Sequence, residues 1–373
     1  MKVAIVGAGI LGLAHAYAAA RKGHFVEVFE RSPKASGASI RNFGMIWPIG
    51  QPAGEMLEMA LRSRQLWLEV LEAAKLHHSP TGSLHVVYRE DEVAVAREFS
   101  EIAPALDYRC EWLGPEEVQA RSGAVNPDGL LGALWSSTEL TVDPRQVICN
   151  LPTFLESELG VRFHFGCAVQ AIDLPQILAG SKTWEADCAI VCSGDDFETL
   201  YPTWFASSGI TRCKLQMMRT LPQPDGWSLG PSLAAGLTLR FYPSFRICPA
   251  LAALERRIGE ETPAYDRWGI HVLVSQTANG ELTLGDSHEY GLAVSIFNRS
   301  EIDDLVFAYA RSFLRVPDLT VAERWYGVYA KHSTAPFVSV TPAESVRVVT
   351  AVGGSGMTLS FGLAERTIRE AGL

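Results

Sequence analysis

Three glycines near the start of the chain, Gly7, Gly9 and Gly12, have the spacing of a loop that binds the phosphates of a dinucleotide. A short apolar run precedes them and an alanine-rich run follows, so they fall between a predicted strand and a predicted helix. In such a loop the glycines permit a tight turn, a close approach to the pyrophosphate and close helix–strand packing. Glu30 follows 18 residues after Gly12, where a carboxylate accepts hydrogen bonds from ribose hydroxyls and repels a 2′-phosphate. The pattern predicts FAD or NAD and argues against NADP.

A second glycine-rich loop, Gly353 to Gly356, opens the last predicted helix. Backbone N–H groups converge in such a loop, and the helix adds the positive end of its dipole. Donors from Gly356, Met357 and Thr358 would stabilise the negative charge that develops at N1 and the C2 carbonyl oxygen of a flavin when it accepts a hydride. NAD enzymes have no such requirement near their carboxyl end, so this loop favours FAD.

Two further segments are expected at the cofactor. The run 36–44 (SGASIRNFG) follows Glu30 closely, and the run 187–194 (DCAIVCSG) is a predicted strand that ends in small residues. The predicted cofactor-binding residues are Gly7, Gly9, Gly12, Glu30, Arg31, Ser39, Asn42, Gly44, Val169, Ser193, Gly194, Gly354, Gly356, Met357 and Thr358.

The elements that must position these residues fall into two groups. Strands are predicted at 2–6, 25–29, 161–165, 169–174, 188–191 and 347–352, and helices at 10–22, 54–75, 92–102, 115–121, 143–159, 302–313 and 357–369, with a kink or break at Pro152. Alternating apolar residues predict further strands at 83–88, 214–220, 237–242, 269–276 and 282–285, with a turn at Asn279-Gly280.

The predicted fold class is α/β, with two domains. A Rossmann-like FAD-binding domain is assigned to residues 1–80, 141–213 and 327–373, and an α+β substrate-binding domain with an antiparallel sheet to 81–140 and 214–326.

The motifs at 7–12, 36–44, 187–194 and 353–362 resemble the D-amino acid oxidase family of FAD-dependent oxidoreductases, on its glycine oxidase and sarcosine oxidase side. The runs 214–220, 268–272, 285–290 and 323–329 also resemble a narrower group linked to phosphonate metabolism, which acts on aminophosphonates. The resemblance implies oxidation of a C–N bond by hydride transfer to flavin N5, followed by hydrolysis of the imine. It implies no obligatory acid–base residue, because the flavin carries the difficult step.

One departure from the family bears on the substrate. Relatives that oxidise α-amino acids hold the carboxylate with an arginine shortly after a Trp-x-Gly motif, whereas here Tyr329 stands near that position after Trp325-Tyr326-Gly327. A phosphonate could instead meet cations and tyrosine hydroxyls, and the predicted substrate-binding residues are Arg41, Tyr242, His271, His288, Tyr290, Tyr329 and Lys331. For each of them an ordinary role, as a solvated cation, a buried histidine or a packing tyrosine, stays open.

The leading hypothesis is therefore an enzyme that oxidises 2-aminoethylphosphonate or its N-methyl form, with dioxygen or an electron carrier as acceptor. Alternatives are a glycine, sarcosine or D-amino acid oxidase, an NAD-dependent dehydrogenase without flavin, and a non-catalytic flavin-binding or electron-carrier protein. Relatives attach flavin covalently through a cysteine after the Trp-x-Gly region or a histidine near the first glycine loop. The corresponding runs, AKHSTAP and SPKASGASIRN, suggest neither attachment, so FAD is expected to bind non-covalently.

Composition narrows the remaining possibilities. A net charge of -10 argues against nucleic acid as a partner, and 47% hydrophobic residues exclude a disordered chain. The seven cysteines form no CxxC pair or zinc-type cluster, so no metal site is predicted and a reducing cytoplasm is the expected location. The apolar run 3–20 imitates a signal peptide or a short membrane span, but its three glycines make a poor helix. We therefore predict neither a signal peptide nor a membrane anchor.

Overall fold

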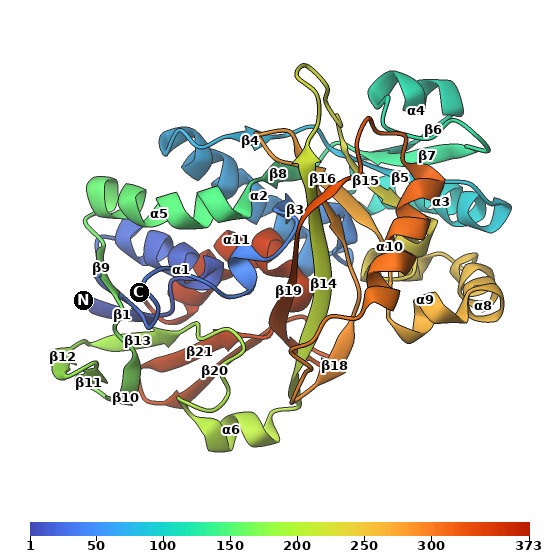
Figure 1. Ribbon diagram of the computed structural model, residues 1–373. Coiled ribbons are helices and arrows are strands. Elements are labelled where there is room, and N and C mark those ends of the chain that lie inside the picture. The colour runs from blue at the N-terminus through green and yellow to red at the C-terminus, as the bar shows by residue number, and fades with distance from the viewer.

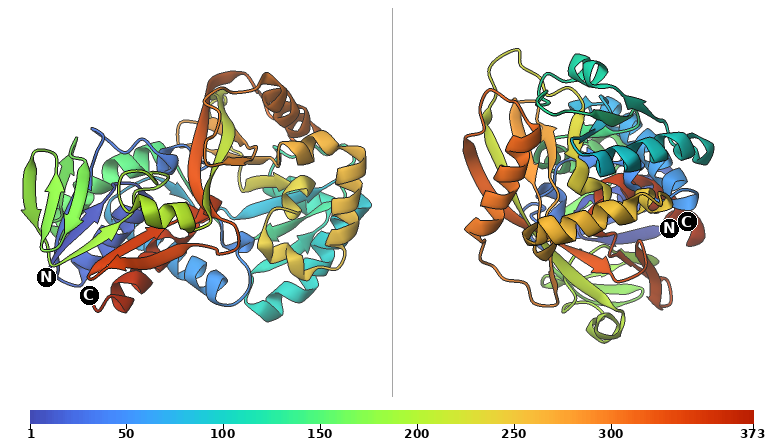
Figure 2. Two further views of the ribbon diagram at one scale, coloured as in Figure 1. Left: turned by 90° about the horizontal axis from the view of Figure 1, so that it is seen from below. Right: turned by 90° about the vertical axis from the view of Figure 1, so that its right-hand side faces the viewer.

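Two large β-sheets lie side by side in the molecule (Figure 1). The computed structural model describes every residue, 1–373. The amino and carboxyl termini lie close together on the half that contains the smaller of these two sheets (Figure 2). None of the helices has the length and apolar character needed to cross a membrane.

The six-stranded sheet is parallel except for one edge strand. Its order is β20 (Val338–Ala343), β21 (Val346–Thr350), β13 (Cys188–Val191), β1 (Lys2–Val6), β2 (Phe25–Glu30) and β9 (Arg162–Phe165). Only β20 runs antiparallel to its neighbour. Strand β1 is apolar on both faces because Val3 and Ile5 join one core and Ala4 and Val6 join another, as its continuous apolar run predicts.

Helices cover one face of this sheet and a small sheet covers the other. The covering helices are α1 (Ile10–Arg21), α2 (Glu55–Ala73), α5 (Pro144–Leu159) and α11 (Gly356–Glu370), which share a core with β1 and β2. The small antiparallel sheet consists of β10 (Val169–Asp173), β11 (Gln176–Ala179) and β12 (Lys182–Glu185). It packs Ile177 and Ala179 against the opposite face, beside Phe205 of α6 (Pro202–Ser207).

The nine-stranded sheet is antiparallel except between β15 and β5. Its order is β18 (Glu289–Gly291), β14 (Ile210–Pro222), β17 (Glu281–Gly285), β16 (Leu273–Gln276), β15 (Ser232–Ala235), β5 (Ser83–Val87), β7 (Gly132–Ser136) and β6 (Cys110–Leu113), and β19 (Val321–His332) pairs with β14. A short sheet of β3 (Met45–Ile46), β8 (Leu140–Val142) and β4 (His78–Ser79) lies where the chain passes between the two halves.

Two cores enclose the nine-stranded sheet. One core contains side chains of α4 (Pro115–Arg121) and α10 (Ser300–Phe313), and the other contains side chains of α3 (Glu90–Ile102), α7 (Gly236–Leu239) and α8 (Leu251–Glu261). The short helix α9 (Pro263–Arg267) follows α8 directly. Five 3₁₀ turns complete the chain: η1 (Ala38–Ile40), η2 (Pro48–Gly50), η3 (Ala103–Leu106), η4 (Pro243–Ile247) and η5 (Gly353–Ser355).

The α/β fold class is confirmed, and most predicted elements differ from the structure only at their ends. The strand predicted at 237–242 is wrong, because α7 occupies 236–239 and every residue of this turn is buried. The Leu237 amide donates to the Tyr309 hydroxyl at 2.9 Å, so it is not available to a neighbouring strand. No break occurs at Pro152, since α5 continues through it. The division into domains stays a prediction, although all six strands of the first sheet fall in the predicted FAD-binding segments.

Candidate active site and cofactor cavity

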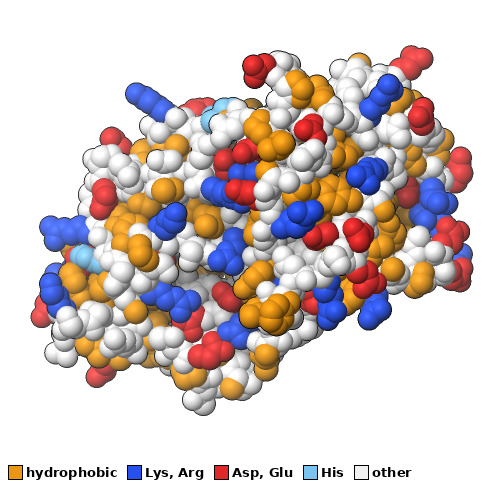
Figure 3. Space-filling view, viewed as in Figure 1, with side chains coloured by type: hydrophobic (Ala, Val, Ile, Leu, Met, Phe, Trp, Pro, Cys, Tyr) orange, Lys and Arg blue, Asp and Glu red, His pale blue; other side chains and the backbone are white.

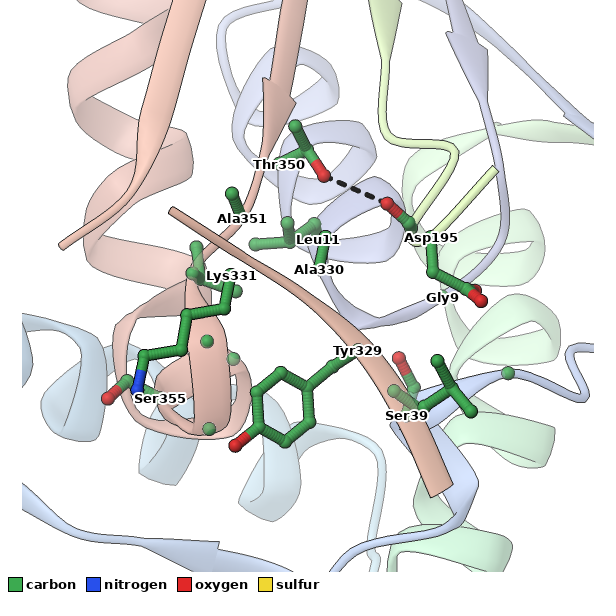
Figure 4. Close-up of a pocket in the computed structure, with 18 of the residues that line it drawn as sticks. Gly9, Leu11, Ser39, Asp195, Tyr329, Ala330, Lys331, Thr350, Ala351 and Ser355 are labelled. Atoms are coloured by element: carbon green, nitrogen blue, oxygen red, sulfur yellow. Dashed lines mark hydrogen bonds between the residues drawn. The ribbon is translucent and has the colours of Figure 1, made fainter. Parts of the chain in front are cut away.

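A cavity of about 760 Å³ is lined by both halves of the molecule. Its lining runs from Glu30, at the end of β2, through the loops before α1 and α11, to His271 and Asp286 of the nine-stranded half. Figure 4 shows part of this wall, where Tyr329 and Lys331 project from β19 toward the same side. A cavity of this size suits a large cofactor with a small substrate beside it.

The loop between β1 and α1 has the close contacts that its glycines predict. Gly7 has φ +100°, and a Cβ there would lie 2.5 Å from the Cys192 carbonyl oxygen. A Cβ on Gly12 would lie 1.8 Å from the Gly7 carbonyl oxygen, so helix and strand pack too closely for any side chain. The Ser39 hydroxyl accepts a hydrogen bond from the Ile10 amide at 2.9 Å, and no side chain of α1 itself caps the helix. The start of α1 lines the cavity and would suit a pyrophosphate.

Glu30 is fixed by two backbone amides. Its carboxylate accepts hydrogen bonds from Ala8 and Ser32, each at 2.9 Å, and it lines the cavity. These bonds hold both oxygens at the end of β2 and leave lone pairs for ribose hydroxyls. The neighbouring Arg31 also lines the cavity but forms an ion pair with Asp196 at 2.8 Å.

The other end of the cavity is formed by η5 and the start of α11. Gly353 has φ +58°, and no side chain caps α11 at Ser355. A Cβ on Gly354 would lie 3.7 Å from the Tyr329 hydroxyl oxygen, and Lys331 pairs with Val352 through an isolated β-bridge. Strand β19, which contains the candidate substrate residues Tyr329 and Lys331, therefore contacts the second glycine loop directly.

Twelve of the fifteen predicted cofactor residues line the cavity, and the other three do not. The twelve are Gly7, Gly9, Glu30, Arg31, Ser39, Asn42, Val169, Ser193, Gly194, Gly354, Gly356 and Met357. Gly12 and Gly44 allow close packing instead, since a Cβ on Gly44 would lie 1.9 Å from the Val142 carbonyl oxygen. The Thr358 hydroxyl is buried and accepts a hydrogen bond from the Trp47 amide at 2.9 Å. The residues present fit FAD: Glu30 would hold the adenosine ribose, and the second glycine loop would hold the flavin.

All seven predicted substrate-binding residues line the same cavity. Lys331 Nζ lies 3.3 Å from the Tyr290 hydroxyl oxygen and makes no ion pair. Arg41 donates to the Tyr326 carbonyl oxygen at 3.3 Å, and its guanidinium lies over the Tyr326 ring, 5.8 Å from its centroid. Burial raises the pKa of Tyr242, Tyr290 and Tyr329, so that their hydroxyls stay protonated and can donate hydrogen bonds.

The structure adds residues that the sequence analysis missed. Asp286 lies between the two predicted histidines, with a carboxylate oxygen 3.1 Å from His271 Nε2. A ring nitrogen of His271, a ring nitrogen of His288 and a carboxylate oxygen of Asp286 all lie within 4.8 Å of one another. We call these three residues the His–Asp–His cluster. Arg246 of η4 also lines the cavity and makes no ion pair. The pairing of β16 with β17 across the predicted 279–280 turn was a signal for Asp286, because it places residues 271 and 286 side by side.

The fold and cavity suit a protein that binds a flavin or a dinucleotide, with most of the candidate substrate residues on the wall of the nine-stranded half. A model of the FAD dependent oxidoreductase family named DAO matches residues 2–369. The chain therefore belongs to this family of oxidoreductases, and FAD is its cofactor.

Solved structures of other proteins share this fold. L-proline dehydrogenase from P. horikoshii is 18% identical, with a TM-score of 0.80, and the match covers 100% of this chain and 93% of that one. Glycine oxidase from Geobacillus kaustophilus is 17% identical, with a TM-score of 0.77 and coverage of 99% and 94%. L-α-glycerophosphate oxidase from Mycoplasma pneumoniae, solved with FAD bound, is 16% identical, with a TM-score of 0.76 and coverage of 100% and 94%.

Proposed function

We propose that the protein oxidises the C–N bond of a small anionic amine, and that its substrate is an aminophosphonate such as 2-aminoethylphosphonate or its N-methyl form. Bound FAD supplies the hydride acceptor. The amine loses a hydride from the carbon next to nitrogen, and water hydrolyses the resulting imine to an aldehyde. The two structural relatives named for glycine and L-proline support C–N chemistry, because both of those substrates are amines.

The observation that carries the anionic substrate is the set of cations in the cavity. Arg41, Arg246 and Lys331 line it without forming an ion pair with any carboxylate of the protein. Lys331 is joined by the Tyr290 hydroxyl at 3.3 Å. A cation and a hydroxyl that converge without an acidic partner suit the oxygens of a phosphonate.

A second candidate is a glycine, sarcosine or D-amino acid oxidase. Lys331 with Tyr290 could bind a carboxylate, and glycine oxidase shares the fold. Against it, Tyr329 rather than an arginine follows Trp325-Tyr326-Gly327, so a bidentate clamp on a carboxylate is missing from β19.

Anaerobic mixing of the holoenzyme with 2-aminoethylphosphonate, its N-methyl form, glycine and sarcosine, followed by flavin absorbance, tests the proposal. Bleaching by the phosphonates at concentrations where glycine and sarcosine have no effect is the expected result. Bleaching by glycine or sarcosine alone would replace the phosphonate with a carboxylate substrate. A flavoprotein that no amine bleaches would instead be a flavin-binding or electron-carrier protein.

A further inference from the structure

The His–Asp–His cluster occupies the wall of the cavity that belongs to the nine-stranded half. His271 lies just before β16, Asp286 just after β17, and His288 just before β18. Two backbone bonds fix this arrangement, since the Asp286 amide donates to the His271 carbonyl oxygen at 2.8 Å and the His288 amide to the Trp268 carbonyl oxygen at 2.8 Å. The side chains of His271 and Asp286 are only 6% and 7% exposed, so this is a built feature of the fold and not a surface charge.

The cluster presents acceptors rather than donors. His288 Nδ1 lies 2.8 Å from the Gly269 carbonyl oxygen, which can only accept, so that nitrogen carries the proton and Nε2 has a free lone pair. Burial lowers the pKa of His288, which keeps its imidazole neutral at pH 7. Asp286 Oδ1 is buried, and although His271 Nε2 is close, no group of the protein donates a hydrogen bond to it. A buried carboxylate oxygen without a donor is unfavourable, and a cationic hydrogen-bond donor from outside the protein would satisfy it.

The spacing suits an ammonium group. The three atoms all lie within 4.8 Å of one another, and His271 Nε2 is 3.1 Å from Asp286 Oδ1. An ammonium group that forms hydrogen bonds of about 2.9 Å can therefore reach all three residues. The Phe241 ring stacks on His271 with centroids 4.2 Å apart, which shields this wall with an apolar ring. An anion would be repelled here by Asp286, so the cluster is poorly suited to a phosphonate.

The two charges of the substrate would then find separate partners. Tyr290 lies between Lys331 and the cluster. Its hydroxyl is 3.3 Å from Lys331 Nζ, and its ring centroid is 6.2 Å from that of His288. Lys331 and the cluster line the same cavity, so a short amine that carries an acidic group could contact both. The ammonium would lie at the cluster and the anion at Lys331.

We propose that the substrate ammonium binds to His271, Asp286 and His288, and that this cluster accepts its proton before the C–N bond is oxidised. This inference rests on the proposed function. In the step, one N–H bond of the ammonium breaks, its electron pair stays on nitrogen, and the proton passes to the cluster. FAD bound in the cavity would supply the acceptor for a hydride from the carbon next to nitrogen, and the amine would become an iminium ion. Only a neutral amine has the lone pair that stabilises this product, so the proton must leave before the hydride.

Other titratable groups face the cluster, and most of them are neutral at pH 7. They are His85 of β5, Cys213 of β14, Tyr242 before η4, Tyr290 of β18, and Tyr329 and Lys331 of β19. Burial lowers the pKa of His85 to about 3 and raises that of Cys213 to about 12, and it raises the pKa of the three tyrosines. Lys331 and Asp286 are thus the charged groups beside the two histidines of the cluster.

The test is the pH profile of anaerobic flavin reduction by the amine that bleaches the wild-type holoenzyme. At pH 7.5 we expect Asp286→Asn to lower the rate constant for flavin reduction on the order of 100-fold. Near pH 10, where roughly a quarter of a free alkyl amine is already neutral, the deficit should shrink to about 5-fold or less. His288→Gln should also lower the rate constant for flavin reduction more at pH 7.5 than near pH 10. Asp225→Asn, an exposed aspartate outside the cavity, is the matched control and should leave the profile unchanged.

Flavin content and the unfolding temperature of each variant report whether it folds. If Asp286→Asn does not fold, His288→Gln is used as the test variant instead. A profile with the wild-type shape in a folded variant would overturn the inference while leaving the proposed function intact. Stoichiometric divalent metal in the purified wild-type protein, lost in Asp286→Asn, would also overturn it. Failure of every amine to bleach the wild type would be a failure of the proposed function itself.

Discussion

Glu30 shows how one carboxylate can serve both fold and cofactor. Its two oxygens accept the Ala8 and Ser32 amides, which ties β2 to the first glycine loop. Replacement by glutamine keeps the shape, removes the charge and turns one acceptor into a donor that opposes an amide. We expect Glu30→Gln to weaken FAD binding by about 10-fold to 100-fold, since hydrogen bonds to charged groups contribute about 1.5–3 kcal/mol. Titration of the apoprotein with FAD measures this.

Glu27→Gln is the matched control, because Glu27 is on the same strand but outside the cavity, 3.4 Å from His164. Equal FAD dissociation constants for the wild type and Glu30→Gln would show that the carboxylate has no role in binding the ribose.

Lys331 should act on substrate binding and not on the chemical step. In Lys331→Met we expect the dissociation constant of the phosphonate to rise about 10-fold to 100-fold, because a charge-assisted bond to the anion is lost. The limiting rate of flavin reduction at saturating substrate should stay near that of the wild type. Stopped-flow reduction over a range of substrate concentrations separates the two constants.

Lys182→Met, at an exposed position in β12, controls for the loss of one positive charge. A fall in the limiting rate with an unchanged dissociation constant would place Lys331 at the reacting centre instead.

At the scale of elements, α2 and α11 pack so closely that Gly362 leaves no room for a side chain. A Cβ on Gly362 would lie 2.4 Å from the Met59 carbonyl oxygen, which belongs to the backbone and cannot turn away. We therefore expect Gly362→Ala to lower the free energy of unfolding by about 1–3 kcal/mol, despite the better helix propensity of alanine. Urea unfolding of the FAD-saturated protein measures the change.

Gly123→Ala is the control, since a Cβ at Gly123 would meet no atom within 4 Å and its φ is not positive. If Gly362→Ala is as stable as Gly123→Ala, the helices can separate at no cost and the tight contact is unimportant.

The elements that the sequence predicted well have strong local signals. The apolar runs 2–6 and 188–191 specify buried parallel strands, and Pro115 with the acidic residues after it specifies α4. The segment 237–242 was misjudged because its alternation of apolar residues arises from packing on all sides, which periodicity cannot distinguish from a strand.

In the candidate site, too, the residues with a local sequence motif were predicted and those without one were missed. Its cofactor loops are contiguous motifs, so twelve of their residues could be placed from the sequence. Asp286 is harder to place, because its position beside His271 depends on the register in which β16 pairs with β17, and the predicted turn alone does not fix that register. Arg246 enters the cavity from a 3₁₀ turn with no sequence signal.

The whole molecule contains neutral histidines buried in both halves, and these should make it sensitive to acid. Burial lowers the pKa of His15 in α1 to about 4 and that of His85 in β5 to about 3. The unfolded chain protonates these imidazoles below about pH 6.5, whereas the folded protein does not until the lower values, so the unfolded state binds more protons. The free energy of unfolding should therefore fall as the pH falls from about 6.5 toward 4, by about 2 kcal/mol per histidine at pH 5.

Urea unfolding at pH 7 and pH 5 tests this prediction. His15→Leu should remove about 2 kcal/mol of the difference between the two pH values, because leucine does not titrate. An equal loss of stability in the wild type and in His15→Leu would mean that other groups control the acid response.

The arrangement of the cavity wall also has a consequence for evolution. Six of the seven candidate substrate residues come from the nine-stranded half, whereas the two glycine loops belong to the six-stranded half. Mutations on one side can change what is oxidised while the cofactor cradle on the other side is inherited intact. A lineage with this layout could therefore change its substrate through one wall of the cavity alone.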